Sequence, residues 1–174
     1  MDLAQYIRNV PDFPHKGIQF KDVTTLLLQP HAFRYIIDQW TARYAGKVDA
    51  IVGVDARGFI FGAALAYTTG LPFVAVRKKG KLPAETCCEE YELEYGKAII
   101  EIHLDALKSG DRVVIIDDLL ATGGTVAAAA KLVRKLGAAP IEAAFVVELP
   151  PLKGRERLEG MGVPVHSLVE FMVD

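Results

Sequence analysis

The chain has 174 residues, 51% of them hydrophobic, and its 20 Lys and Arg nearly balance its 22 Asp and Glu, for a net charge of −2. These values suit a single domain over 1–174 and give no basic footprint for nucleic-acid binding. No apolar run is long enough to span a membrane, and the N-terminal stretch MDLAQYIRNVPDFP lacks the regions of a secretory signal. Adjacent Cys87 and Cys88 form no disulfide framework and lie at no zinc spacing, so we expect a reduced, cytoplasmic setting without nucleic-acid or membrane partners.

The first expected element is a helix at Leu3–Asn9, and a loop rich in Pro and Gly follows over 11–22. Apolar spacing predicts a helix after Pro30, with its apolar stripe from Phe33 to Tyr44. Further helices are predicted at Gly58–Thr69 and Gly124–Leu136, which Gly70 and Gly137 close, and near Lys153–Glu159. Short apolar runs predict strands at Asp49–Val54, Phe73–Arg77, Arg112–Asp117, Ile141–Glu148 and Val165–Val169. Between them, Lys78 to about Thr86 is expected to be a loop, and Tyr91–Tyr95 with Ala98–His103 a two-stranded ribbon.

Strands that alternate with helices predict an α/β fold in which helices cover both faces of a doubly wound parallel sheet. Ligands of such sheets bind at the carboxyl ends of the strands. The chemistry of the chain is therefore expected where apolar strands give way to polar loops.

The stretch VVIIDDLLATGGT, residues 113–125, combines an apolar strand that ends in two acids with a glycine loop and a helix start. Glycine has no Cβ, so backbone N–H groups of the loop can close around an anion, and the helix N-terminus adds unpaired donors. Asp117 and Asp118 are suited to accept hydrogen bonds from sugar hydroxyls or to face a cation. The stretch predicts a site for a ribose with a phosphate at one end, the phosphate being held by Thr122, Gly123, Gly124 and Thr125.

This stretch resembles the phosphoribosyl diphosphate (PRPP) signature of type I phosphoribosyltransferases, and DDLLATGGT resembles the adenine-specific members. Other segments resemble that family in the same order, namely PDFPHKGIQFKDVT (11–24), GVDARGFIFG (53–62), VRKKGKLPAET (76–86), YELEYGKAIIEIH (91–103) and VVELPPLKGRERL (146–158). The resemblance spans nearly the whole chain. It implies the type I phosphoribosyltransferase fold, with an N-terminal hood over the base within 1–30 and a flexible catalytic β-ribbon loop over 78–95, and it adds Ala121 to the phosphate cradle.

Cationic residues follow two of the expected strands. Arg57 in GVDARGF suits bidentate phosphate contacts, and the resemblance implies a pyrophosphate loop there, with a cis peptide at Asp55–Ala56. In the run RKKGK the resemblance implies a pyrophosphate clamp formed by Arg77, Lys78 and Lys81. The alternative for both groups is a solvated surface position.

The resemblance also implies the residues that handle the base. Glu94 would accept the N9 proton of adenine, with Tyr95 ordering the closed loop, although an acid on a ribbon can equally form a cross-strand ion pair. In the hood, Phe20 would stack on adenine, while a lone Phe is more often a core residue. The remaining base-site candidates are Gln19, Lys21, which stands where many relatives have Arg, and Leu149.

Taken together, the resemblance implies an enzyme that joins adenine to PRPP, giving AMP and pyrophosphate in purine salvage. Magnesium is expected as the partner of the substrate's diphosphate, held mainly through substrate oxygens, with no metal ligands assigned to the protein. A homodimer is expected because relatives are homodimers. The alternatives are transfer to another purine base, a catalytically idle PRPP-sensing regulator, and a plain nucleotide-binding module.

Overall fold

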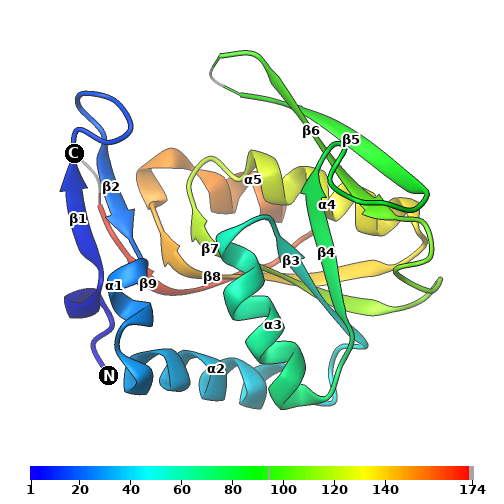
Figure 1. The fold of residues 1–174 in the computed structure, drawn as a ribbon, viewed down its shortest axis with the longest axis horizontal. Coiled ribbons are helices and arrows are strands. Elements are labelled where there is room, and N and C mark those ends of the chain that lie inside the picture. The colour runs from blue at the N-terminus through cyan, green and yellow to red at the C-terminus, as the bar shows by residue number, and fades with distance from the viewer. Residues whose placement is uncertain (94, 173–174) are drawn as a thin grey trace.

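The computed structural model describes residues 1–93 and 95–172, which build one seven-stranded sheet and a small two-stranded sheet (Figure 1). The strand order of the large sheet is β5-β6-β4-β3-β7-β8-β9. The five strands β4, β3, β7, β8 and β9 run parallel to their neighbours in this order. Strand β6 pairs antiparallel with both β4 and β5. The strands are β3 (Ala50–Val54), β4 (Phe73–Lys78), β5 (Thr86–Glu92), β6 (Lys97–His103), β7 (Arg112–Leu120), β8 (Ala139–Glu148) and β9 (Val165–Glu170).

Helices cover both faces of this sheet, as the α/β prediction requires. One buried cluster joins α2 (Pro30–Tyr44) and α3 (Arg57–Thr69) to the sheet through side chains such as Trp40 and Phe61. The other cluster joins α4 (Gly124–Lys135) and α5 (Gly154–Gly160) to the opposite face. The doubly wound parallel sheet is therefore confirmed. Within the described ranges, no helix has both the length and the apolar character needed to cross a membrane.

The N-terminal segment differs from the prediction. A single 3-10 turn, η1 (Ala4–Tyr6), stands where a helix at Leu3–Asn9 was expected, and it is followed by strand β1 (Arg8–Pro11). Strand β1 pairs antiparallel with β2 (Gln19–Asp22), so the predicted loop over 11–22 is also wrong at both ends. This pairing satisfies backbone groups that a helix would have satisfied internally, and it outweighs the weak local preference. A short helix, α1 (Thr24–Leu27), leads on to α2.

Most strands lie within one or two residues of their predicted bounds, but β7 and β5 differ more. Strand β7 runs past the two acids to Leu120, because β8 continues to pair with it as far as the register Leu120↔Glu148. Strand β5 spans Thr86–Glu92 and pairs Thr86 with His103, so the predicted arm Tyr91–Tyr95 was placed too far toward the C-terminus. In β5, ladder pairing with β6 carries the strand through the polar residues Glu89 and Glu90. A two-stranded ribbon is present as predicted, with its first arm displaced.

Candidate active site

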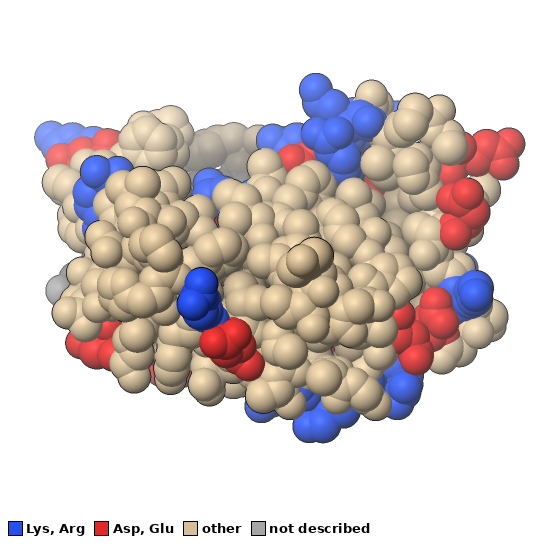
Figure 2. Space-filling model, turned by 60° about the horizontal axis from the view of Figure 1, so that its bottom comes forward, with Lys and Arg blue, Asp and Glu red and all other residues tan. Residues whose placement is uncertain are grey.

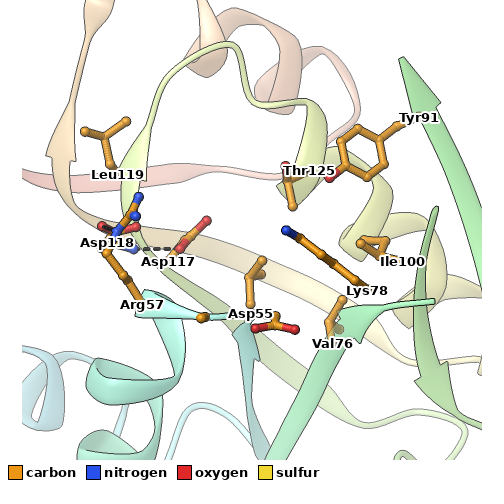
Figure 3. Close-up of a pocket in the computed structure, with 12 residues that line it drawn as sticks. Asp55, Arg57, Val76, Lys78, Tyr91, Ile100, Asp117, Asp118, Leu119 and Thr125 are labelled. Atoms are coloured by element: carbon orange, nitrogen blue, oxygen red, sulfur yellow. Dashed lines mark hydrogen bonds and ion pairs between the residues drawn. The ribbon is translucent and has the colours of Figure 1, made fainter. Parts of the chain in front are cut away.

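A cavity of about 420 Å³ opens at the carboxyl ends of β3, β4 and β7 (Figure 3). Its walls come from three junctions that lie far apart in the sequence, where Arg57, Lys78 and Asp117 are placed. Parallel strands bring their carboxyl ends to one edge of the sheet, which explains why these polar side chains meet there. This is the position in which the sequence analysis expected ligand chemistry.

The two acids of β7 form the polar floor of the cavity. Asp118 is 3% exposed and pairs with the Arg57 guanidinium at the start of α3. The backbone N–H of Asp118 donates to Asp117 Oδ1 at 2.8 Å. Burial and the adjacent charge of Asp118 hold the pKa of Asp117 well above its usual range. The acids are thus oxygen acceptors held in place by the sheet, with one cation beside them.

A close approach of α3 to β7 makes this arrangement possible. A Cβ at Gly58 would lie 2.7 Å from the carbonyl oxygen of Ile116 and 3.0 Å from Asp117 Oδ1. Only a residue without a side chain allows the start of α3 to sit against the strand at this distance. Gly58 therefore sets the spacing between Arg57 and the acid pair.

The glycine loop closes against the N-terminus of α4, as predicted. Gly123 has φ 78°, a left-handed conformation that favours glycine, and it caps the helix. A smaller cavity of about 90 Å³ lies directly at this loop and is lined by residues from Ala121 to Val126 together with Asp117. Unpaired helix N–H groups and the helix dipole favour an anion in such a place. The structure therefore brings the acid pair and the predicted cradle, Ala121, Thr122, Gly123, Gly124 and Thr125, together.

The basic residues at the end of β4 and just after it are only partly gathered at the cavity. Lys78 lines it and points inward (Figure 3). The Nε of Arg77 donates instead to Asp55 Oδ2 at 3.2 Å, and its guanidinium carbon lies 5.9 Å from the centre of the Phe59 ring. Lys81 is exposed, and its backbone N–H donates to the Lys78 carbonyl oxygen. The peptide bond at Asp55–Ala56 is cis, as the resemblance implied.

A second cavity of about 340 Å³ lies under the N-terminal segment and shares Arg57 with the first. Phe20 and Phe13 meet edge to face there, with ring centres 5.1 Å apart, and the Arg57 guanidinium carbon lies 5.5 Å from the centre of the Phe20 ring. Val10, Asp22 and Thr24 complete its lining. An apolar slot with aromatic walls suits a flat heterocycle.

The other base-site candidates lie less directly at this slot. The side-chain oxygen of Gln19 accepts a hydrogen bond from the amide of Asn9 at 2.7 Å, and Lys21 Nζ donates to the other end of that amide at 2.9 Å. Leu149 is buried and belongs to the core cluster of α2 and α3. In the described part of the chain it is not among the residues that line the slot.

Comparison with known proteins agrees with this geometry. A family model described as phosphoribosyl transferase domain matches residues 27–161. An adenine phosphoribosyltransferase of Jannaschia sp. (strain CCS1) is 54% identical over 97% of this chain and 95% of its own length. The chain belongs to the adenine phosphoribosyltransferase family. The crystal structure of the Thermoanaerobacter pseudethanolicus member has a TM-score of 0.93 and 52% identity, with 98% of both chains covered. That of the Saccharomyces cerevisiae member, complexed with an imino-altritol bisphosphate and adenine, has a TM-score of 0.91 and 42% identity, with 96% of both chains covered.

Within this phosphoribosyltransferase, several residues at the two cavities were not found from the sequence. Tyr91 of the ribbon lines the main cavity, and Asp22 and Thr24 line the base-side slot. Arg157 of α5 lies beside the cradle, since a Cβ at Gly124 would come within 3.3 Å of its Nη1. The alternation of β5 places Tyr91 and Glu89 on one face, which was a usable signal, whereas nothing local to Arg157 points to the start of α4. Glu94, the predicted proton acceptor, lies outside the described residues.

Proposed function

We propose that this chain transfers the 5-phosphoribosyl group of PRPP to N9 of adenine, giving AMP and pyrophosphate in purine salvage. The observation that carries the proposal is the meeting of two cavities at Arg57: an aromatic slot on one side, and an acid pair with an anion cradle on the other. A base and a ribose phosphate placed in these cavities would meet beside Arg57. The family and the adenine-bound relative support the same reading.

The sugar phosphate would be held by β7 and the loop that follows it. The cradle from Ala121 to Thr125 would bind the 5′-phosphate through backbone N–H groups and the two threonine hydroxyls. Asp117 and Asp118 would accept hydrogen bonds from the ribose hydroxyls. Donors on the ribose stabilise the ionised carboxylates and so oppose the raised pKa of Asp117.

The leaving pyrophosphate would be stabilised by cations at the neighbouring strand ends. Arg57 and Lys78 already line the cavity, and Arg77 and Lys81 would join them from the start of the loop over 78–95. In the reaction N9 forms a bond to C1′ with inversion, and the C1′–O bond breaks with its electron pair leaving on pyrophosphate. Positioned cations lower the energy of that developing charge.

The base would be held by the hood within 1–30. Phe20 would stack on adenine, backbone groups of Gln19 would meet the purine edge, and Lys21 and Leu149 would border the site. The proton of N9 would pass to the carboxylate of Glu94 as the new bond forms. Closure of the loop over 78–95 would exclude water, which competes for the electron-poor C1′.

Magnesium would enter with the substrate. Over residues 1–93 and 95–172 no group of three or more His, Cys, Asp and Glu side chains gathers where it could hold a metal ion. Mg²⁺ prefers to keep water and phosphate oxygens as ligands, so the diphosphate of PRPP would supply most of its shell, with Asp117 and Asp118 the carboxylates beside it. There it would neutralise charge on the leaving group.

We also propose a cytoplasmic homodimer. Figure 2 shows a broad face over α2 and α3 on which few charged side chains lie, and α3 exposes Ile60 and Tyr67, the latter at 89%. A face with few charges and exposed apolar side chains favours a protein partner. Sedimentation of the wild-type chain and of Tyr67→Lys tests this: a dimer that the substitution dissociates is expected, and a wild-type monomer would contradict it.

The activity is tested by incubating the protein with PRPP, Mg²⁺ and adenine, hypoxanthine, guanine or xanthine separately, and following nucleotide and pyrophosphate by chromatography. AMP from adenine alone is expected. A nucleotide from an oxo-purine instead would change the substrate assignment. Bound PRPP with no nucleotide from any base would sink the enzyme and leave a PRPP-sensing protein.

A further inference from the structure

Tyr91 of the ribbon touches the anion cradle. The Thr125 Oγ1 donates to the Tyr91 phenol oxygen at 3.2 Å, and both side chains line the main cavity (Figure 3). A Cβ at Gly124 would lie 3.6 Å from Tyr91 Cδ2, so the ring also packs against the first residue of α4. The Tyr91 phenol therefore contacts Thr125, the residue in the first turn of α4 whose hydroxyl is expected to donate to phosphate.

This contact is the last of a row that fastens β5 along α4. Lys135 Nζ lies 2.6 Å from Glu89 Oε2 and donates to the Cys88 carbonyl oxygen at 2.8 Å. Lys131 Nζ lies 3.8 Å from Glu89 Oε1. The lysines hold the ribbon toward the C-terminal half of the helix, and Tyr91 holds it at the N-terminus. Tyr91 and Thr125 thus join the ribbon directly to the cradle.

A phosphate in the cradle would change the polarity of the Tyr91–Thr125 contact. A threonine hydroxyl has a single proton to donate, and it can accept through its lone pairs. Once Thr125 donates that proton to a phosphate oxygen, the phenol must become the donor for the contact to persist. The result is a chain from the Tyr91 O–H to Thr125 Oγ1, and from the Thr125 O–H to phosphate, in which each hydrogen bond polarises the next.

We propose that Tyr91 is a positioning residue that couples occupation of the 5′-phosphate cradle to placement of the ribbon β5–β6. The inference rests on the proposed function, because it takes the cradle to be the 5′-phosphate site. Tyr91 stands three residues before Glu94, the proposed proton acceptor, in the sequence. A fixed Tyr91 would therefore fix the end of β5 from which the chain continues toward Glu94. Binding of the sugar phosphate would in this way prepare the ribbon for its part in the reaction.

The test compares Tyr91→Phe with wild type, using ribose 5-phosphate and pyrophosphate as separate probes in calorimetric titrations. The substitution removes the phenol oxygen and keeps the ring. Ribose 5-phosphate should bind about 5-fold more weakly, the loss of one hydrogen bond in a chain, and pyrophosphate should bind as before. Tyr35→Phe, a half-buried tyrosine on α2, is the matched control and should leave both affinities unchanged.

Hydrogen exchange of Thr86–Glu92 supplies the second readout. Ribose 5-phosphate should slow exchange of these amides in wild type and in Tyr35→Phe, and should not do so in Tyr91→Phe. Unchanged affinities with the protection retained would overturn the coupling, and so would equal weakening of both probes, which indicates general damage.

The AMP assay separates this inference from the proposed function. A wild type that binds ribose 5-phosphate and protects the ribbon but forms no AMP would sink the transferase and support the coupling. A wild type that does not bind ribose 5-phosphate would overturn both.

Discussion

The strand-end site and the ribbon are built in opposite ways. At the strand end, Asp118 is almost fully buried, Gly58 leaves no room for a Cβ, and the glycine loop is backed by Gly154, whose carbonyl oxygen would lie 3.1 Å from a Cβ at Gly123. On the ribbon, Ile100 and Ile102 bury the inner strand β6 in the core, whereas the outer strand β5 also relies on exposed ion pairs: the Lys97–Glu90 pair across the two arms is 60% and 50% exposed.

This difference bears on two proposed steps, namely substrate binding at the strand ends and closure of the ribbon over the bound substrate. Charges in a buried, pre-formed site act through a low dielectric and need no rearrangement when the substrate binds. Exposed ion pairs each contribute about 0–1 kcal/mol, so a segment held by them can leave its place at little cost. If the proposed sites are correct, we expect the ribose phosphate to meet a pre-formed site at the strand ends, and the outer arm β5 to move more readily than those strand ends.

Removing the buried carboxylate should have the largest effect. Asp118→Asn keeps the shape but loses the charged partner of Arg57 and the proposed acceptor for a ribose hydroxyl. Hydrogen bonds to charged groups contribute about 1.5–3 kcal/mol, so kcat/KM for PRPP should fall by about 100-fold. Steady-state kinetics at varied PRPP concentration measure this.

The matched control is Asp49→Asn, which lies just before β3 and contacts the start of β7, at the edge of the sheet opposite the site. Asp49 pairs with Arg112, and both side chains are exposed, at 40% and 51%. Its kcat/KM should stay within about twofold of wild type, as expected for a surface pair. Equal losses in the two variants would remove the contrast between buried site and surface.

Tight packing behind the site predicts the next effect. Gly58→Ala forces a Cβ against the Ile116 carbonyl oxygen, which belongs to a central strand and cannot move aside. The free energy of unfolding should fall by about 3 kcal/mol, the upper range for overpacking. Urea titration measures it, with Gly160→Ala as control, because no atom lies within 4 Å of a Cβ at Gly160. Similar midpoints for both variants would contradict the close approach.

The strand-end site could be predicted from the sequence because its determinants are local. An apolar strand, the acids Asp117 and Asp118, two glycines and a helix start follow one another without interruption, and the parallel topology brings Arg57 and Lys78 to the same edge. Even the cis peptide at Asp55–Ala56 was expected, through the family resemblance. Local order and sheet topology were sufficient here.

The hood and the ribbon could not be predicted to the same extent, because non-local pairing decides them. Strand β1 exists through its pairing with β2, and the Leu3–Asn9 stretch alone gives no sign of that partner. Arg157 reaches the cradle only because α5 packs beside the loop. Arg77 was expected to contact pyrophosphate, but in the structure it donates to Asp55. The sequence does not reveal whether Arg77 faces Asp55 or the pyrophosphate site.

The hood contains a buried carboxylate, Asp22, whose charge leads to a prediction about pH. Asp22, 9% exposed, accepts hydrogen bonds from the Thr24 hydroxyl at 2.7 Å and from Arg8 of β1. These contacts lower the pKa of Asp22 from 3.8 to about 2, Thr24 contributing most, against the opposing effect of burial. Because the folded pKa is the lower one, the carboxylate stabilises the fold above about pH 4, and this stabilisation is lost between about pH 4 and pH 2.

Asp22→Asn should therefore lower the free energy of unfolding by about 2 kcal/mol at pH 7 and flatten its decline between pH 4 and pH 2. Urea titrations across this range measure both. Asp38→Asn, an exposed carboxylate on α2, should follow the wild-type curve. An Asp22→Asn curve parallel to wild type would show that the hood is held without this anchor.

The smallest effect concerns the ribbon, where adjacent residues allow a strict comparison. Glu89 pairs with Lys135 and Lys131 of α4, and Glu90 pairs with Lys97 of β6. Successive residues of a strand face opposite sides, so Glu89→Gln weakens docking on the helix and Glu90→Gln weakens only the pairing of the two arms. We expect the free energy of unfolding to fall by less than about 1 kcal/mol in each case.

Hydrogen exchange distinguishes the two variants. Exchange at Thr86–Glu92 should become faster in both, but only Glu89→Gln should also speed exchange of the exposed amides at the C-terminal end of α4. If Glu90→Gln sped exchange in α4 as much, the pairing of the two arms would also hold the ribbon on the helix. The contacts of Glu89 with Lys131 and Lys135 would then not be the contacts that hold β5 on α4 on their own.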